Sequence, residues 1–474
     1  MRENVGKVKR KRVKKTQMNK KRSAFSGKIG YVLSAAGASV GLGNIWRFPY
    51  LAAKYGGGIF LLVYIILALT FGYTMIVAES ALGRMTRKSP VGAFRSFAKG
   101  KKVGWLSFGG WINAIIPVLI VPYYSVIGGW VVKYLFEYLR GNGSKLAEDG
   151  YFSGFISNGG ATEICFVIFC MFTLVIIYAG VQNGIERVSK IMMPILVVLS
   201  VIIAIYSVTR PGAIEGVKYF LVPNVKNFSW MTVVAAMGQM FYSLSIAMGI
   251  LVTFGSYMRK DTSIEDSTRN VEIFDTAIAM MAGLMIIPAV FAFSGGDPDT
   301  LQAGPSLMFI TIPKVFANMG FGTAVGILFF VLVLFAAVTS SIALTESAVS
   351  TFEDELGWGR KKATVLTGVI MIALGTLSCL GYGPLDFVKI IGMQFLDFFD
   401  FLTNSVMMPI AALMTSLLVS RVIGVDKIEE EIRHGESAFR RKKIFVVMIK
   451  YLCPIFALII LASSVANAFG WIAM

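Results

Sequence analysis

Long apolar runs alternate with short polar connections along most of the chain. Runs of the length needed to cross a bilayer, about 20 residues each, occur at residues 28–54, 58–83, 104–139, 161–181, 187–208, 230–257, 271–293, 322–350, 363–380, 388–419 and 443–472. Backbone polar groups inside lipid must be satisfied within the segment, which favours helices. The pattern therefore predicts an all-α polytopic membrane protein with about 11 transmembrane helices.

One further stretch between the seventh and eighth runs is apolar but too short to span. Residues Asp297–Pro305 form a polar, proline-containing connection, and Ser306–Asn318 follow it. We expect Ser306–Asn318 to be a helical plug or lid that lies over the outer face.

The composition of the 474-residue chain agrees with this prediction. Hydrophobic residues make up 56% and charged residues 15%, against roughly 45–50% and 25% in soluble domains. The chain has 45 Lys and Arg against 27 Asp and Glu, a net charge of +18. In a soluble protein that excess would indicate nucleic-acid binding, so the placement of the cations decides its meaning.

The cations divide unequally between the two sides of the predicted membrane. With a cytoplasmic N-terminus, the inside segments hold 34 Lys and Arg and the outside loops hold 7. Such a bias sets the orientation of membrane proteins. The charge therefore indicates topology and a lipid partner, with no nucleic acid. An odd number of spans then places the C-terminus outside.

The basic segment at residues 1–26 is predicted to be a cytoplasmic tail. It is either a disordered topology signal or a regulated contact with anionic lipid or with the cytoplasmic face of the helices.

Cysteine and histidine usage excludes several kinds of chemistry. Cys165, Cys170, Cys379 and Cys453 lie in apolar stretches without a CxxC motif, and His434 is the single histidine. Neither a zinc site nor a disulfide framework is indicated, and a histidine-based catalytic triad cannot form. We expect a protein that is not an enzyme.

The first apolar run contains residues that ordinary transmembrane helices lack. Gly37, Gly41, Gly43, Asn44 and Arg47 crowd its middle. Glycine weakens a helix by about 1 kcal/mol relative to alanine, and an asparagine at bilayer depth must find a partner. Unwound backbone at that depth is tolerated where it is buried or lines a cavity. The pattern predicts a helix broken near its centre.

The sixth run has the same character, with hydroxyl and small residues between Gln239 and Gly249. Because the two broken runs are five apart, they occupy corresponding positions in two five-helix halves, residues 27–208 and 230–420. Five is odd, so the second half is inverted; residues 443–474 form an additional eleventh helix. Paired interrupted helices indicate a transporter binding site, although a kink filled by packing remains the alternative for each.

Two other spans carry polar groups at membrane depth. In the eighth, Ala336–Ser341 contains Thr339, Ser340 and Ser341. Such hydroxyls either bond to their own helix or, beside unwound carbonyls, suit a hard cation such as Na⁺. In the seventh, Asp275 is followed by almost twenty uncharged residues, and an intramembrane acid is a functional candidate by default.

Four motifs carry a resemblance to a known family. They are GLGNIWRFPYLAAKYGGG (Gly41–Gly58), YSLS in the sixth span, AAVTSS (Ala336–Ser341) and FEDELG (Phe352–Gly357). Together they resemble the neurotransmitter:sodium symporter family, most closely its bacterial amino-acid transporters of the LeuT type. The resemblance runs from about Arg22 to Ser420. It implies a 5+5 inverted repeat in which helices 1 and 6 are broken.

The resemblance implies two sodium sites and no further cofactor. The first, completed by the carboxylate of the substrate, would comprise Ser39, Asn44, Ser243 and Asp275. The second would comprise Gly37, Val40, Ala336, Thr339 and Ser340.

A substrate pocket and two gates are implied in the same way. The substrate would contact Ser39, Leu42, Gly43, Ile120, Tyr124, Tyr242, Ser243, Ser245, Met248, Ser340 and Leu344. The N–H groups of Leu42 and Gly43 would receive its carboxylate at a helix N-terminus. Tyr124 and Tyr242 would form an aromatic lid. An outer gate would pair Arg47 with Asp400, and an inner gate would pair Arg22 with Asp354.

Two positions refine the functional prediction. Monoamine transporters of the family carry an Asp where this chain has Gly41, so a glycine favours a substrate that brings its own carboxylate. Chloride-dependent members carry an Asn where this chain has Asp275, so transport should not need chloride. Met248 gives the pocket an adaptable wall.

The sequence thus predicts a sodium-coupled symporter for neutral, apolar or aromatic L-amino acids in the plasma membrane, the inner membrane of a bacterium. The alternative is a non-transporting sensor or a substrate-gated channel on the same fold.

Overall fold

The structure is a computed structural model that describes residues 22–98, 104–294 and 305–471. Within these ranges the secondary structure is helical apart from turns and one isolated bridge between Ile390 and Met393. Most of the predicted basic tail and nearly all of the connection before Ser306 lie outside the described residues.

Nine helical segments of the described chain are long and apolar enough to cross a membrane. They are Gly58–Thr86 (α4, Gly58–Leu67, and α5, Tyr73–Thr86), Gly104–Leu139 (α7, Ser107–Leu139), Gly159–Ala179 (α10), Val181–Val208 (α11, Arg187–Val208), Ile264–Ser294 (α15), Gly322–Leu356 (α17), Arg360–Leu380 (α18), Phe395–Ile423 (α19, Phe395–Asp400, and α20, Met408–Leu417) and Lys442–Ala468 (α22, Lys442–Val447, and α23, Cys453–Ala468).

The other two predicted spans are interrupted helices. The first consists of α2 (Lys28–Ser39), a π-helical turn at Gly43–Arg47 and α3 (Phe48–Lys54). The sixth consists of α13 (Trp230–Ser243) and α14 (Ile250–Tyr257). With the nine continuous segments they make eleven spans, so the predicted fold, including the broken first and sixth helices, is confirmed.

Shorter helices connect the spans on both sides. They are α6 (Pro90–Ala98), α8 (Gly143–Leu146), α9 (Tyr151–Ser157), α12 (Ala213–Leu221), α16 (Ile312–Ala317) and α21 (Val425–Arg433). The expected helix within Ser306–Asn318 is present as a π-helical turn at Leu307–Thr311 followed by α16.

Several predicted boundaries differ from the structure, and two span starts differ by seven residues. The seventh span begins at Ile264 rather than 271, because Glu265 and Asp266 occupy its first turn, where acidic residues favour a helix N-terminus. The tenth begins at Phe395 rather than 388, since residues before it form a tight turn with Gly392 at φ 77°.

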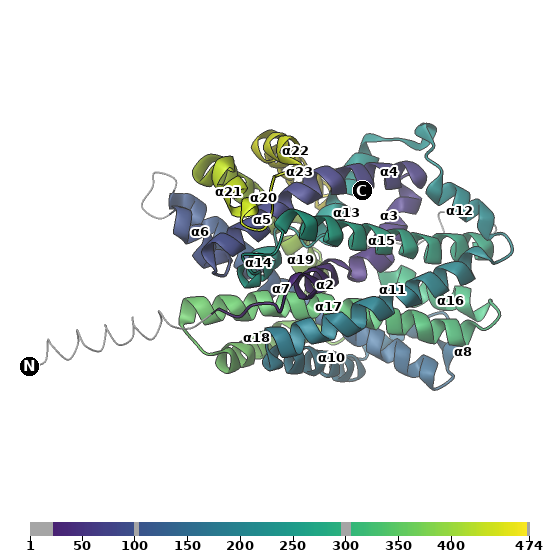
Figure 1. Cartoon of the computed structure of the whole chain (residues 1–474). Coiled ribbons are helices and arrows are strands. Elements are labelled where there is room, and N and C mark those ends of the chain that lie inside the picture. Colours follow the sequence, from purple (N-terminus) through teal and green to yellow (C-terminus); the bar gives the residue numbers. More distant parts are fainter. Residues whose placement is uncertain (1–21, 99–103, 295–304, 472–474) are drawn as a thin grey trace, which may run out of the picture.

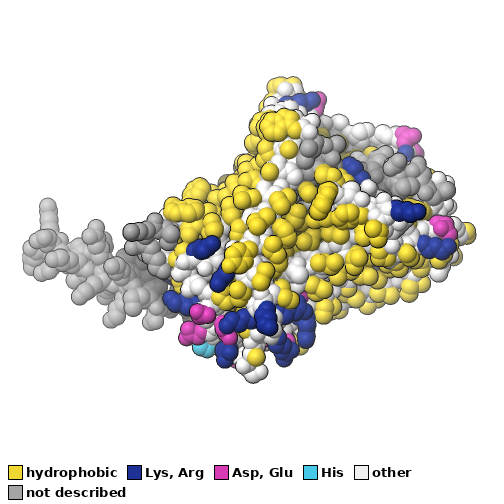
Figure 2. All heavy atoms as spheres, turned by 90° about the horizontal axis from the view of Figure 1, so that it is seen from above, with side chains coloured by type: hydrophobic (Ala, Val, Ile, Leu, Met, Phe, Trp, Pro, Cys, Tyr) yellow, Lys and Arg dark blue, Asp and Glu magenta, His cyan; other side chains and the backbone are white. Residues whose placement is uncertain are grey.

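The broken first helix lies at the centre of the molecule. Figure 1 shows α2 between α15 on one side and α17 on the other, with α10 and α18 beyond α17. Apolar side chains cover a broad outer face, and charged side chains gather towards the two ends (Figure 2). Ile164 and Val175 of α10, each 64% exposed, are typical of a lipid-facing surface.

Candidate sodium and substrate site

The break in the first span begins where α2 ends at Ser39. Val40 is extended (φ −73°, ψ 97°), and the helix resumes at Gly43. The amide oxygen of Asn44 accepts the N–H of Gly41 at 3.1 Å, which replaces a lost helical bond. A Cβ at Gly43 would lie 2.3 Å from the Tyr242 ring. Glycine is therefore needed there because another part of the chain approaches the backbone.

The break in the sixth span is held by three residues in the left-handed region. Ser245, Ala247 and Gly249 have φ of 53°, 60° and 69°, a conformation that costs non-glycine residues energy. A carboxylate offsets this cost: Glu79, fully buried on the second span, accepts the N–H of Ala247 at 2.8 Å. Glu79 therefore braces the unwound segment of the sixth span.

Asp275 is the centre of a buried polar cluster. Its carboxylate, which has no exposed surface, accepts hydrogen bonds from Asn44 (2.8 Å), Tyr64 (2.8 Å) and Ser243 (2.8 and 3.0 Å). Among the ion pairs of the described residues, none involves Asp275. A buried carboxylate without a cation is costly, so this cluster of oxygen ligands suits a small cation.

The residues of the predicted second sodium site also come together. The hydroxyl of Ser340, on α17, lies 3.3 Å from the carbonyl oxygens of both Gly37 and Val40, which belong to the first span. Thr339 instead donates to carbonyls of α17, including Ala336 at 3.2 Å. The sequence left two alternatives open for these hydroxyls, a bond to their own helix or a contact with unwound carbonyls. Thr339 bonds to its own helix, whereas Ser340 reaches the unwound first span.

A small cavity lies between the two clusters. The predicted substrate residues that line it are Ser39, Leu42, Gly43, Ile120, Tyr124, Tyr242, Ser245, Met248, Ser340 and Leu344. Ser243, the remaining one, points to Asp275 instead. The Tyr124 hydroxyl accepts the Leu42 N–H at 3.3 Å, and the Ser245 hydroxyl donates to the Ala38 carbonyl at 2.9 Å. The lining thus combines apolar side chains with backbone polar groups of the first span.

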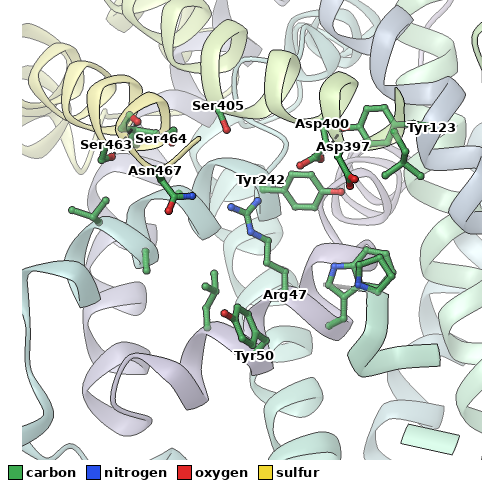
Figure 3. Close-up of a pocket in the computed structure, with 18 of the residues that line it drawn as sticks. Arg47, Tyr50, Tyr123, Tyr242, Asp397, Asp400, Ser405, Ser463, Ser464 and Asn467 are labelled. Atoms are coloured by element: carbon green, nitrogen blue, oxygen red, sulfur yellow. Dashed lines mark hydrogen bonds between the residues drawn. The ribbon is translucent and has the colours of Figure 1, made fainter. Parts of the chain in front are cut away.

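A larger cavity of about 430 Å³ shares Tyr242 with this one and holds the predicted outer gate. Figure 3 shows Arg47 and Asp400 facing it with Tyr242 between them. Arg47 lies 5.4 Å from the centre of the Tyr242 ring, while Asp400 accepts hydrogen bonds from Asn404 (2.6 Å) and Tyr123 (3.2 Å). Among the described residues, no ion pair joins Arg47 to Asp400. Arg47 and Asp400 thus contact different neighbours and leave the predicted outer gate unpaired.

The outer cavity has a wall that the sequence did not predict. Ser463, Ser464 and Asn467 of α23 line it (Figure 3). The additional eleventh span therefore contributes polar groups to the approach to the site.

The predicted inner gate is closed. Arg22 donates to Asp354 at 2.6 Å and to Ser350 at 2.7 Å, and it lies 4.9 Å from the centre of the Tyr257 ring. Burial opposes the charge of Arg22, but the nearby carboxylates of Asp354, Glu346 and Glu353 outweigh it and raise the pKa of the guanidinium. We call this end of the molecule the inner end.

A second buried ion pair stands behind the inner gate. Glu346 of α17 has no exposed surface; it accepts the Tyr257 hydroxyl at 2.7 Å and pairs with Arg360 at the start of α18. Sequence reasoning missed it, although a lone acid in an apolar helix is the signal that singled out Asp275.

Known proteins resemble this chain in both sequence and structure. The sequence profile of the sodium:neurotransmitter symporter family matches residues 22–145 and 151–470. The uncharacterized sodium-dependent transporter YhdH of Bacillus subtilis is 36% identical, over 87% of this chain and 91% of that protein. A sodium-dependent transporter of Haemophilus influenzae, also uncharacterized, is 32% identical over 95% and 99%.

A solved structure supports the same assignment. The crystal structure of MhsT in complex with L-phenylalanine superposes with a TM-score of 0.84 at 36% identity, and the match covers 94% of this chain and 100% of that one. These relatives are membrane transporters and not enzymes. The chain is therefore a multi-pass, sodium-dependent transporter of the sodium:neurotransmitter symporter family.

Proposed function

We propose that the protein is a symporter that couples the entry of Na⁺ to the uptake of neutral, apolar or aromatic L-amino acids. The observation that carries this proposal is the cavity between the two breaks. Its backbone groups at Leu42 and Gly43 suit a carboxylate at a helix N-terminus, and its apolar lining residues Ile120, Met248 and Leu344 suit an uncharged apolar side chain. The relative MhsT binds L-phenylalanine.

The space at Gly41 supports an amino acid over an amine. A Cβ there would lie 2.6 Å from the Ser340 hydroxyl, so the position cannot hold a carboxylate for an amine without displacing Ser340. The substrate must bring its own carboxylate. That carboxylate would complete the first sodium site with Ser39, Asn44, Ser243 and Asp275, while Gly37, Val40, Ala336, Thr339 and Ser340 would hold a second Na⁺.

The carboxylate of Asp275 supports transport without chloride. It supplies a fixed negative charge beside the first sodium site, and it bonds to Tyr64 and Ser243. An anion is then not needed to balance Na⁺. Protonation of Asp275 after sodium leaves would also return a proton in the opposite direction.

The state of the two gates supports alternating access. The inner end is closed by Arg22 and Asp354, while Arg47 and Asp400 remain apart across an open outer cavity. This arrangement suits the binding of sodium and substrate from outside. The helices of spans one, two, six and seven would then rock against the rest. With the excess of cations on the inner side, the N-terminus would be cytoplasmic and the C-terminus outside.

A sodium-gradient uptake screen tests the proposal. The full-length protein is reconstituted into proteoliposomes and offered each of the common amino acids, with Na⁺ replaced by Li⁺, K⁺ or choline in parallel. We expect concentrative uptake of one or more neutral apolar amino acids that requires Na⁺ outside. Binding without accumulation would favour a sensor, and dissipation of a substrate gradient would favour a channel.

Asp275→Asn tests the part of the proposal that concerns chloride. We expect the variant to lose most sodium-driven uptake in chloride-free buffer and to regain part of it when chloride is added. Asp261→Asn, which removes a carboxylate from the exposed pair with Arg259, is the matched control and should transport normally. Full activity of Asp275→Asn that is indifferent to chloride would contradict the proposal.

A further inference from the structure

An apolar groove runs along the lipid-facing surface between α10 and α18. It has a volume of about 380 Å³ and lies next to the inner end of the molecule. Its lining residues are Met171, Leu174, Val175, Tyr178, Thr364, Val365, Gly368, Val369 and Ile372. Val175 and Val365 are 64% and 63% exposed, so the groove opens towards lipid and not towards the transport pathway.

Cationic groups lie at the inner mouth of the groove. Lys361 and Lys362, both exposed, follow the N-cap of α18, and the ammonium of Lys361 lies 5.5 Å from the centre of the Tyr178 ring. The neighbouring acids Glu346 and Glu353 both pair with Arg360. Among the ion pairs of the described residues, none involves either lysine.

The backbone of the same helix adds to this positive end. The N-cap of α18 is Gly359, which has no side chain to accept the N–H groups of the first turn. Free N–H groups and the helix dipole favour an anion at this position. Tyr178 is 50% exposed and, beside the lysine, is typical of the level of the phospholipid headgroups.

One buried hydroxyl in the groove has no partner. Thr364 is 4% exposed, its hydroxyl makes no hydrogen bond, and it lines the groove. Thr367, one turn further along, donates to the Ala363 carbonyl at 2.9 Å, as a threonine in a helix usually does. A buried unsatisfied hydroxyl costs free energy, and an oxygen of a bound molecule would remove that cost.

From these observations we infer that the groove is a binding site for one anionic diacyl phospholipid of the phosphatidylglycerol type. An acyl chain fills the apolar groove and a polar oxygen of the lipid accepts the Thr364 hydroxyl. The phosphate lies against Lys361, Lys362 and the first turn of α18. The apolar groove, the unpartnered hydroxyl and the cationic mouth lie in that order along α18, which matches the order of chain, ester and phosphate in the lipid.

Native mass spectrometry of the delipidated full-length protein tests this inference. The protein is titrated with dioleoylphosphatidylglycerol, with dioleoylphosphatidylcholine and with inorganic phosphate. We expect one phosphatidylglycerol to be retained preferentially, and neither of the other two. K361Q/K362Q should weaken its retention about thirty-fold, since each cation near a lipid surface contributes about 1 kcal/mol. Thr364→Val should weaken it about five-fold.

Matched variants separate the groove from general effects of charge and surface. K427Q/K443Q removes two other exposed lysines and should leave retention unchanged. Val365→Trp fills the groove from its exposed side and should abolish retention, whereas Val447→Trp, at a site 51% exposed on α22, should not. Sodium-driven uptake by each variant verifies that it is folded.

Three outcomes would overturn the inference. Phosphatidylcholine could be retained as well as phosphatidylglycerol, or K427Q/K443Q could weaken retention as much as K361Q/K362Q. In the third outcome, Val365→Trp converts a dimer to a monomer without changing lipid retention. The occupant of the groove would then be a second copy of the chain.

Discussion

The ion pair at the predicted inner gate allows a quantitative prediction for Arg22→Gln. The guanidinium donates to Asp354 and Ser350 and, at 3.0 and 3.1 Å, to Ser256. Its side chain is 16% exposed. Hydrogen bonds to charged groups contribute about 1.5–3 kcal/mol each, and glutamine can keep a neutral one. We expect a net loss of about 2–3 kcal/mol from the closed state, a shift of about 30- to 150-fold towards inward opening.

The assay measures how often the inner end opens. Ser34 of α2 is 2% exposed and its hydroxyl has no partner, so Ser34→Cys is a suitable reporter once the four native cysteines are replaced by alanine. A membrane-impermeant thiol reagent is applied from the inner side. When closing is fast, the modification rate follows the population of the open state and should rise by the same 30- to 150-fold in Arg22→Gln.

A surface pair close to the gate provides the control. Arg95 pairs with Glu355 at 2.7 Å, but its side chain is 44% exposed, and such pairs contribute about 0–1 kcal/mol. Arg95→Gln should therefore change the rate by about five-fold at most. Equal modification rates in Arg22→Gln and Arg95→Gln would refute the assignment of Arg22 to the gate.

Three further outcomes follow from the site. Tyr124→Phe removes the hydroxyl that meets the Leu42 N–H and should raise the KM for uptake about ten-fold with little change in kcat; an unchanged KM would exclude Tyr124 from carboxylate binding. Gly43→Ala places a Cβ 2.3 Å from the Tyr242 ring, and this overpacking, about 1–3 kcal/mol, should weaken equilibrium amino-acid binding at least five-fold; wild-type affinity would contradict the close approach. Replacing Na⁺ by choline should lower the melting temperature of the purified protein, by the equivalent of about 2.7 kcal/mol if Na⁺ was at 100 times its Kd, and identical melting in both salts would argue against sodium binding to the folded state.

The sequence predicted the spans and the residues that come together at the site. Span positions follow from the apolar length of each segment, and the breaks follow from glycine and polar residues inside it, as at Gly41–Asn44. The site residues were predicted from sequence motifs. The structure brings most of the predicted substrate residues to one cavity. These features are local because a segment partitions into lipid according to its own composition.

Polar pairing across helices could not be predicted in the same way. Arg84 of α5 is fully buried and pairs with Glu431 of α21, 347 residues away, and Glu346 pairs with Arg360 behind the gate. No local sequence pattern in either helix identifies the residue with which its buried charge pairs. Buried charges must be satisfied by whichever group the packing brings within reach.

The sequence by itself therefore determined the number of spans and the two breaks, and it predicted that the side rich in cations is the inner one. The tertiary structure alone decided that Ser340, and not Thr339, reaches the first span. It also decided that Arg47 and Asp400 stand apart while Arg22 and Asp354 meet. Finally, it decided that a groove with an unpartnered hydroxyl faces the lipid. The reason is physical: insertion into a membrane depends on one segment at a time, whereas a hydrogen bond, an ion pair or a cavity depends on how two or more segments pack.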